Sequence, residues 1–415
     1  MEKLVKNKNK RFLPVLLGTD ANAYGMARNF HQVYGIKSLA LGKIPLLETR
    51  HSKIVQVQTY EGFDTDEVFR EVLTNIADTY RPIYDNLILI ACGDRYTELI
   101  CSHKDWLSDY FIVPYIDLEL KNRLENKEEF YNICEEYGLD YPATVMLHKD
   151  DKPPFDLPFD YPIAVKASDS IEYVDLDFPG KKKAYKANSP AELEQIFSDI
   201  YGAGYTGTLI VQDFIPGDDA TMYVLNSYSD ANGKVQAMCL GHCVLEDYTP
   251  AGIGNYNAII QEGIQEVYDK YKAFLEAIGF VGFSNFDIKY DERDGRYKVF
   301  EINIRQGRSS FFTTVSGCNL VTYLVNDRIV HRQKPEVHYH NAPALWLHVP
   351  TRLVLEYAPE RVLPQIRRMM SAKKTDCTLL YDQDMTPYRR VMINRFYYQQ
   401  WKRYEDWFNK RSISD

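Results

Sequence analysis

The first 122 residues alternate short apolar runs with amphipathic segments, and this order restricts the possible folds more than any other feature of the chain. Residues 11–18 predict a buried strand, and a helix is expected from about residue 24 to residue 34, ended by Gly35. A continuous apolar run that ends at Gly93-Asp94 is typical of a central parallel strand. Strands separated by helices favour an α/β domain built on an open parallel sheet.

The loops that follow two of these strands are the first candidates for a binding site. Ligands of open parallel sheets bind at the carboxyl ends of the strands, so residues 20–24 and 94–97 are predicted to face a ligand. We assign four substrate-binding candidates to these loops: Asn22, Tyr24, Asp94 and Arg95. The planar guanidinium of Arg95 suits a substrate carboxylate, although it could equally pair with the neighbouring Asp94.

Three further segments follow this domain. A predicted connector helix leads into a strand-helix-strand module that is small enough to form a separate lobe. A larger mixed segment contains a helix and a pair of strands. The last segment carries no motif; we expect it to be helical and to pack on the large lobe. The predicted boundaries of the four parts are 1–122, 123–225, 226–330 and 331–415.

Composition excludes several classes of protein. Hydrophobic residues make up 45% of the 415 positions, which excludes a disordered chain. A net charge of −9 argues against unassisted binding to nucleic acid or to an anionic membrane. Neither a membrane span nor a signal peptide is recognisable, so we expect a cytoplasmic protein. The seven scattered cysteines predict reduced thiols, and His242 beside Cys239 and Cys243 lacks the second ligand pair of a zinc site.

The strongest chemical signal is a predicted strand near residue 300. Two-residue alternation divides its side chains between two faces. The polar face carries Glu301, Asn303 and Arg305, and the apolar face carries Phe300, Ile302 and Ile304. Three polar groups therefore converge on one side of the strand.

A second strand brings another carboxylate to that face. With a five-residue loop at 292–296, which contains the turn signal Asp294-Gly295, Asp287 pairs opposite Glu301. Two carboxylates and a carboxamide so close together repel one another unless a hard divalent cation relieves the repulsion. Mg²⁺ held together with nucleotide phosphates fits best. The alternative is a hairpin with a solvated acidic face.

Other polar positions are less specific when taken alone. Lys166 ends an apolar strand, Lys127 begins the connector helix, and the acidic pair Asp218-Asp219 follows a Pro-Gly turn. A solvent-facing strand end, an ordinary helix start and an exposed acidic turn would explain all three. Their order along the chain makes them informative.

That order resembles the ATP-grasp superfamily from about residue 11 to about residue 325. The stretches that carry the resemblance are NKEEFYNICEEYGLDYPAT, YPIAVKAS, LIVQDFIPGDD and FDIKYDERDGRYKVFEINIR. The resemblance implies an α+β ATP-grasp fold within the α/β class. Two lobes would clasp ATP next to the N-terminal parallel-sheet domain.

The resemblance also implies the residues that would bind the cofactors, ATP and two Mg²⁺ ions. The implied nucleotide-binding residues are Lys127, Lys166, Gln212, Asp213, Ile215 and Asp219. The two lysines would hold phosphates, the backbone of Asp213 and Ile215 would contact adenine, and Asp219 would bind the ribose. Gln212 departs from the family, which usually has a glutamate there. The implied magnesium ligands are Asp287, Glu301 and Asn303.

The two arginines that follow the metal ligands are the catalytic candidates. The resemblance places Arg305 near the reacting phosphoryl and carboxylate groups. Transfer of a γ-phosphoryl group to a carboxylate brings anions together, so fixed cations must neutralise them. An amine can then displace phosphate through an oxyanion for which Arg305 or Arg308 would be the hydrogen-bond donor. The loops at 169–185 and 249–259 could shield the acyl phosphate from water or could be plain surface connections.

Within the superfamily, VKASDS, CLGHCVLED and FEINIRQGRSSFF most resemble bacterial peptidoglycan cross-bridge ligases of the D-aspartate ligase kind. This resemblance implies D-aspartate, activated at its side-chain carboxylate, as donor. The implied acceptor is the lysine amine of a UDP-MurNAc-pentapeptide. The alternatives are ligation of another carboxylate and amine, carboxylation with bicarbonate, or a catalytically silent nucleotide-binding regulator. A homodimer is compatible with the sequence.

Overall fold

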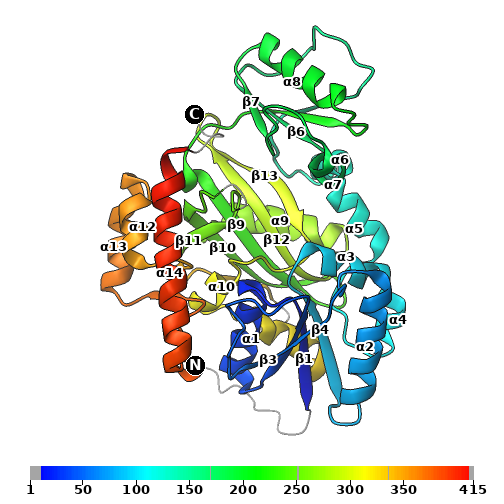
Figure 1. The fold of residues 1–415 in the computed structure, drawn as a ribbon, viewed down its shortest axis with the longest axis vertical. Helices are drawn as coiled ribbons and strands as arrows, with labels where there is room; N and C mark the ends of the chain where they lie inside the picture. Colours follow the sequence, from blue (N-terminus) through cyan, green and yellow to red (C-terminus); the bar gives the residue numbers. More distant parts are fainter. Residues whose placement is uncertain (1–10, 169, 250–251, 335, 411–415) are drawn as a thin grey trace.

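The computed structural model describes residues 11–168, 170–249, 252–334 and 336–410, and their strands form three sheets (Figure 1). The N-terminal sheet has the strand order β3-β2-β1-β4, and all of its strand pairs are parallel. Its strands are β1 (Phe12–Leu17), β2 (Ser38–Gly42), β3 (Val55–Thr59) and β4 (Asn86–Ala91). The predicted open parallel sheet is confirmed.

The helices that follow β1 and β4 begin inside segments that were predicted to be loops. Helix α1 (Ala21–Tyr34) starts three residues before the expected position, because Asp20 caps it by accepting the N–H of Ala23. Gly35 ends α1 in the left-handed conformation, as predicted. Helix α3 (Asp94–Ser102) begins at Asp94, so residues 94–97, predicted to be a loop, form its first turn.

Four more helices complete this part of the chain and lead to the next sheet. They are α2 (Asp66–Tyr80), α4 (Lys104–Ser108), α5 (Leu118–Glu125) and α6 (Lys127–Glu136). Four apolar positions were predicted for the connector helix, and one of them, Tyr137, lies just after α6 and is exposed. The other three, Phe130, Ile133 and Cys134, are buried in α6. They join the core that the N-terminal sheet shares with the large sheet described below.

A small antiparallel sheet lies at one end of the molecule (Figure 1). Its strands, in the order β5-β8-β6-β7, are β5 (Thr144–Leu147), β6 (Ile163–Ala167), β7 (Tyr185–Ala187) and β8 (Leu209–Asp213). Helices α7 (Ser170–Asp175) and α8 (Pro190–Gly202) accompany it. The sheet has its own cluster of buried apolar side chains, as a separate lobe requires.

The large sheet is the centre of the molecule. Its long strands are β9 (Met222–Ser229), β10 (Val235–Glu246), β11 (Tyr256–Gln261), β12 (Gly282–Asp291) and β13 (Arg296–Asn303). Helix α9 (Gln265–Ala277) packs on one face through buried aromatic residues such as Phe274, which contacts Phe286 of β12. Helices α10 (Phe311–Val315) and α11 (Leu320–Val325) belong to the core between this sheet and α1.

The C-terminal segment was expected to be helical, and this expectation is incomplete. Three short strands of this segment, β14 (His338–His340), β15 (Leu345–Leu347) and β16 (Thr375–Cys377), extend the large sheet. The segment also forms helices α12 (Thr351–Tyr357), α13 (Leu363–Ser371) and α14 (Pro387–Trp407). Strands of three residues are too short for a two-residue pattern to be recognised in the sequence.

Several smaller features complete the description. The short helical turns are η1 (Asp219–Thr221), η2 (Asn326–Val330), η3 (Glu360–Val362), η4 (Asp382–Asp384) and η5 (Phe408–Lys410). All seven cysteines are buried free thiols. Among the described residues, no cluster of histidine, cysteine and acidic side chains could hold a metal ion by itself. None of the helices in the described ranges is both long and apolar enough to cross a membrane.

Candidate active site

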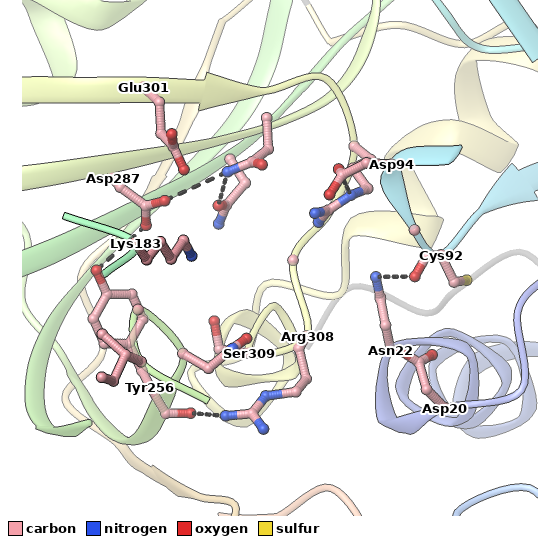
Figure 2. Close-up of a pocket in the computed structure, with 18 residues that line it drawn as sticks. Asp20, Asn22, Cys92, Asp94, Lys183, Tyr256, Asp287, Glu301, Arg308 and Ser309 are labelled. Carbon is pink, nitrogen blue, oxygen red and sulfur yellow. Dashed lines mark hydrogen bonds and ion pairs between the residues drawn. The ribbon is translucent and has the colours of Figure 1, made fainter. Parts of the chain in front are cut away.

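A cavity of about 400 Å³ lies where the N-terminal sheet meets the large sheet (Figure 2). Its walls come from the β1–α1 and β4–α3 turns, the β12–β13 hairpin, the segment after β13 and the loop before β11. Seven residues predicted from the sequence line it: Asn22, Asp94, Asp287, Glu301, Asn303, Arg305 and Arg308. The cavity therefore brings together the predicted metal ligands, the two arginines predicted to be catalytic and half of the predicted substrate residues.

The register of the β12–β13 hairpin explains why its carboxylates meet. The turn contains four residues, 292–295, not the five that were predicted, and Asp291 pairs with Arg296. A β-bulge then shifts the register, so that Asp287 does pair with Glu301. The predicted pairing is confirmed, although the loop length used to predict it was wrong.

The same bulge corrects the prediction for Phe300. Alternation had placed Phe300 on the apolar face, but Val299 occupies the core and Phe300 is only partly buried. The Nζ atom of Lys166 lies 6.0 Å from the centre of the Phe300 ring. The bulge adds one residue to β13, and an extra residue reverses the alternation of side chains across it. Val299 can therefore face the core on one side of the bulge while Glu301 faces the cavity on the other.

The predicted metal ligands present oxygen atoms to the cavity. Two neighbours that were not predicted from the sequence, Tyr256 and Asn285, hydrogen-bond to them. Asn303 donates from Nδ2 to Asp287 Oδ2 at 3.4 Å and to Asn285 Oδ1 at 3.2 Å. Tyr256 donates its hydroxyl hydrogen to Asp287 Oδ1 at 3.3 Å. Asn285 lies two positions before Asp287 on the same strand, so two-residue alternation could have identified it.

Electrostatics at the hairpin fits a bound divalent cation. Burial and the nearby charge of Glu301 raise the pKa of Asp287 well above its usual value. Lys127 lowers the pKa of Glu301 to about 2, and its Nζ lies 2.8 Å from Glu301 Oε2. Carboxylate and carboxamide oxygens are ligands that Mg²⁺ prefers, and its charge would let both acids ionise. Asp287, Glu301 and Asn303 would hold the ion.

The two predicted phosphate lysines approach this hairpin from different elements, α6 and β6. Lys127 begins α6, and its Nζ also donates to the carbonyl oxygen of Phe300 at 3.3 Å. Lys166 lies on β6 of the small sheet. Burial, together with the charge of Lys127, lowers the pKa of Lys166 to about 8. Anionic phosphates between these lysines would stabilise both positive charges.

The two arginines line the cavity beyond the metal ligands. Arg305 donates from Nε to Asp94 Oδ1 at 2.6 Å, which connects the segment after β13 to the start of α3. Arg308 donates from Nη2 to the carbonyl oxygen of Tyr256 at 3.0 Å and to Asn257 Oδ1 at 3.2 Å. Asp94 therefore lines the cavity and also holds Arg305 in position.

The four substrate-binding candidates separate into two pairs. Asn22 lines the cavity and donates from Nδ2 to the carbonyl oxygens of Cys92 and Gln306 at 3.3 and 3.0 Å. The structure does not bring Tyr24 or Arg95 to the cavity. Tyr24 is fully buried and donates to Asp384 Oδ2 at 2.8 Å, because the early start of α1 turns it towards the C-terminal segment.

Arg95 lies on the outer side of α3. It pairs with Glu98 at 2.9 Å and with Asp66 at 3.4 Å, and all three side chains are exposed. Exposed ion pairs of this kind contribute little to stability. Arg95 therefore lies outside the cavity, and it pairs with Glu98 and Asp66 in place of Asp94.

The predicted adenine and ribose residues lie at the end of β8 and in the segment that follows it. Gln212 is buried and donates from Nε2 to the hydroxyls of Tyr131 and Thr144, both at 2.9 Å. The N–H of Asp213 donates to Ala143, and its carboxylate pairs with Arg293. A second cavity, of about 610 Å³, is lined by Asp213 and Phe214.

In the segment that follows β8, Ile215 is buried, and Asp219, at the start of η1, is enclosed by the protein itself. Asp219 Oδ2 accepts the N–H of Glu246 at 2.8 Å and the hydroxyl of Tyr248 at 2.7 Å. These contacts give Asp219 a structural role at the end of β10. Contact with a ribose stays a prediction.

Both loops that were expected to shield the intermediate contribute to the cavity. Lys183 comes from the first loop, and residues 253–255 come from the second. Asp247 shapes the second loop by accepting the N–H and the hydroxyl of Thr249 at 3.0 and 2.8 Å. Asp169, Pro250 and Ala251, which belong to these loops, lie outside the described residues.

Comparison with known proteins identifies the family. No family model matches the chain. A D-aspartate ligase from Enterococcus faecium (strain Aus0004) is 44% identical over 412 residues, which cover 97% of this chain and 98% of the relative. An identity this high along almost the whole of both chains shows common membership of a family.

Solved structures agree with the fold. An L-amino acid ligase from Bacillus licheniformis is similar with a TM-score of 0.55 at 14% identity, covering 77% of this chain and 74% of the ligase. An N5-carboxyaminoimidazole ribonucleotide synthetase, solved as an ADP complex, has a TM-score of 0.57 at 13% identity, with 87% and 86% covered.

A biotin carboxylase from Campylobacter jejuni has a TM-score of 0.54 at 14% identity, with 76% of this chain and 70% of that protein covered. At these identities the structural matches show the fold alone, and the family rests on the D-aspartate ligase relative. The cavity, with its paired carboxylates and flanking lysines and arginines, agrees with both. The chain is an enzyme that belongs to the D-aspartate ligase family of ATP-grasp carboxylate-amine ligases.

Proposed function

We propose that this enzyme uses ATP and Mg²⁺ to join the side-chain carboxylate of D-aspartate to the lysine amine of a UDP-MurNAc-pentapeptide, releasing ADP and phosphate. The observation that carries the proposal is the 44% identity to a D-aspartate ligase over 97% of this chain. The charges at the cavity support it, because the reaction needs a metal site, cations for phosphates and a place for a small anionic substrate. A nucleotide-linked, multiply charged acceptor is consistent with a cytoplasmic enzyme.

The nucleotide would lie between the two lobes. Lys127 and Lys166 approach the hairpin from α6 and β6, where they would hold phosphate oxygens. The backbone of Asp213 and Ile215 would contact adenine beside the second cavity. The buried amide of Gln212 already donates to two hydroxyls, so it would hold β8 in place and would not contact adenine itself.

Arg305 and the two ions that we propose at Asp287, Glu301 and Asn303 would serve the first chemical step. A carboxylate oxygen of the donor attacks the γ-phosphorus of ATP, the bond to the bridging oxygen breaks, and ADP leaves. Mg²⁺, when bound, would neutralise the phosphate charges. Arg305, held in place by Asp94, would orient the donor carboxylate and the transferred phosphoryl group.

The second step forms the amide. The unprotonated lysine amine attacks the acyl carbon, the carbon–oxygen bond to phosphate breaks, and the nitrogen loses a proton. A guanidinium of Arg305 or Arg308 would stabilise the oxyanion that forms during this attack. Lys183 and residues 253–255 would help to exclude water, which otherwise hydrolyses the acyl phosphate.

A phosphate-release assay tests the proposed function. ATP and Mg²⁺ would be supplied with single D- and L-amino acids, with bicarbonate as a further candidate, each with and without a lysine-containing muropeptide precursor. We expect the largest phosphate release with D-aspartate and the precursor together. Turnover with a different donor would replace D-aspartate, and ATP binding without turnover on any pair would indicate a silent regulator.

A further inference from the structure

The cavity has charged groups of both signs on the side away from the metal ligands. In Figure 2, Asp20 and Asn22 lie across the view from Asp287 and Glu301, with Arg308 between the two groups. The sequence reading did not assign Asp20. An amino acid carries a carboxylate and an ammonium group on the same carbon atom, so a wall with a cation and an anion is complementary to it.

Arg308 has an anchored guanidinium with unused hydrogen-bonding capacity. Nη2 is fixed by Tyr256 and Asn257, while Nη1 lies 3.9 Å from the carboxylate of Asp247. Within the described part of the chain, the buried Nε atom of Arg308 has no hydrogen-bond acceptor. Burial lowers the pKa of Arg308, so an anion bound here would stabilise its charge.

Asp20 is placed at the cavity by its role as the cap of α1. Oδ1 accepts the N–H of Ala23 at 3.1 Å. Over the described ranges, no lysine or arginine nitrogen lies within 4.0 Å of the Asp20 carboxylate, so Asp20 forms no ion pair with them. Burial raises the pKa of Asp20, and the charges of Arg305 and Arg308 oppose this effect. The half-buried carboxylate of Asp20 lines the cavity, where a cationic ligand would stabilise its charge.

Asn22 lies in the first turn of α1, which Asp20 caps, and gives a second, independent indication that a hydrogen-bond-donating ligand binds here. It is 3% exposed, and its Nδ2 is held by two backbone carbonyl oxygens. Its buried Oδ1 atom accepts no hydrogen bond from any residue that the structure describes. Buried amide oxygens rarely lack a hydrogen-bond donor. An ammonium group has three N–H donors and could satisfy both this oxygen and Asp20.

We propose that Asp20, with Asn22, binds the ammonium group of the amino-acid donor, and that Arg308 binds its non-reacting α-carboxylate. This inference rests on the proposed function. Arg305 is the less suitable partner for the α-carboxylate, because it is paired with Asp94 and directly follows the strand of the proposed metal ligands. With Arg308 on the α-carboxylate, Arg305 would be the hydrogen-bond donor to the oxyanion. The reacting carboxylate at the metal, the α-carboxylate at Arg308 and the ammonium at Asp20 fix three substituents, which is enough to select one enantiomer.

Two analogues that each lack one group test the assignment. Succinate is aspartate without the ammonium group, and β-alanine is aspartate without the α-carboxylate. Hydroxylamine would replace the acceptor, so that hydroxamate formation reports the donor step alone. For D-aspartate we would measure KM, and for each analogue the Ki as a competitive inhibitor, which needs no turnover of the analogue.

The two variants should give opposite patterns. In Asp20→Asn, which keeps a good helix cap, we expect the KM for D-aspartate and the Ki for β-alanine to rise about tenfold or more, with the Ki for succinate nearly unchanged. In Arg308→Gln, D-aspartate and succinate should weaken while β-alanine does not. Arg308→Lys is the substitute if Arg308→Gln does not fold. Asp117→Asn is the control, because Asp117 caps α5 outside the cavity in the same way.

The outcomes separate this inference from the proposed function. Absence of hydroxamate from D-aspartate with the wild-type enzyme would overturn the proposed function. Normal hydroxamate formation in the wild type, combined with equal effects of Asp20→Asn on all three compounds, would overturn the inference alone. Unchanged donor constants with slower ligation to the lysine acceptor would also overturn it, because Asp20 would then act on the acceptor amine.

Discussion

The two walls of the cavity are built in different ways. One wall is a single hairpin, in which Asp287 and Glu301 face each other because β12 and β13 pair locally. The opposite wall is assembled from two turns of the N-terminal sheet, and its contact with the hairpin segment, from Asn22 to Gln306, spans 284 positions. A local wall depends on register, whereas an assembled wall depends on how separate parts of the chain dock.

The assembled wall depends on the C-terminal segment. Arg389 of α14 donates to the carbonyl oxygens of Glu48 and Arg50 and lies 4.4 Å from the centre of the Tyr24 ring. It also pairs with Asp384 at 3.2 Å, and both side chains are almost fully buried. This buried ion pair therefore fixes α1, which Asp20 caps, against the C-terminal segment.

Loss of this ion pair should have the largest effect. Arg389→Met leaves the charge of Asp384 buried without its partner, so we expect the free energy of unfolding to fall by about 3 to 5 kcal/mol. Urea denaturation would measure it, with Arg390→Met as the control at an exposed position of the same helix. Unfolding of Arg389→Met within about 0.5 kcal/mol of the wild type would contradict the role of this contact.

The hairpin wall should respond through catalysis and not through stability. Glu301→Gln would make one of the three proposed metal ligands neutral, so we expect kcat/KM to fall by roughly three decades and the Mg²⁺ requirement to rise. A magnesium titration of activity measures both. Glu292→Gln in the turn of the same hairpin is the control, since Glu292 lies outside the cavity and pairs with the exposed Arg361. Wild-type metal dependence of Glu301→Gln would exclude Glu301 from the metal site.

Arg305 connects the two walls through Asp94, so its replacement separates chemistry from binding. In Arg305→Lys a point charge replaces a planar fork, and we expect the single-turnover rate to fall by about two to three decades. The Kd for ATP should stay within about threefold of the wild type. If the lysine variant reacts within about threefold of the wild-type rate, Arg305 serves only to balance the nearby acids.

The smallest predicted effect concerns pH and the small lobe. Lys166 has a pKa lowered to about 8 in the free protein, and bound phosphate favours its charged form. ATP binding must therefore take up a proton above this pH, so the affinity should fall about tenfold between about pH 7 and about pH 9. Titration calorimetry measures the affinity and the proton uptake.

Two variants sharpen this test. Lys166→Arg stays charged, so its affinity for ATP should not change over this pH range. Lys166→Ala should weaken ATP binding and activity together. A wild-type affinity that is independent of pH would show that Lys166 does not contact the phosphates.

Much of the fold was predictable because its signals are local. The parallel N-terminal sheet follows from apolar runs separated by helices, and the end of α1 follows from Gly35. The pairing of Asp287 with Glu301 was predicted correctly, but the bulge at Phe300 was not, because no residue there signals an extra position. The start of α1 was placed three residues too late, at Tyr24, and residues 94–97 were predicted to be a loop although α3 begins at Asp94. Helix ends are the least certain part of such a prediction, because residue type alone does not fix them.

The sequence by itself determined the chemistry of the hairpin wall, since residues on adjacent strands meet through backbone pairing that extends over a few positions. Only the tertiary structure decided the rest of the cavity. Asp20 became a candidate ligand because its turn docks beside Arg308, and Tyr24 was removed because α14 covers it. Contacts between distant segments depend on the packing of whole elements, and no pattern of neighbouring residues encodes that packing.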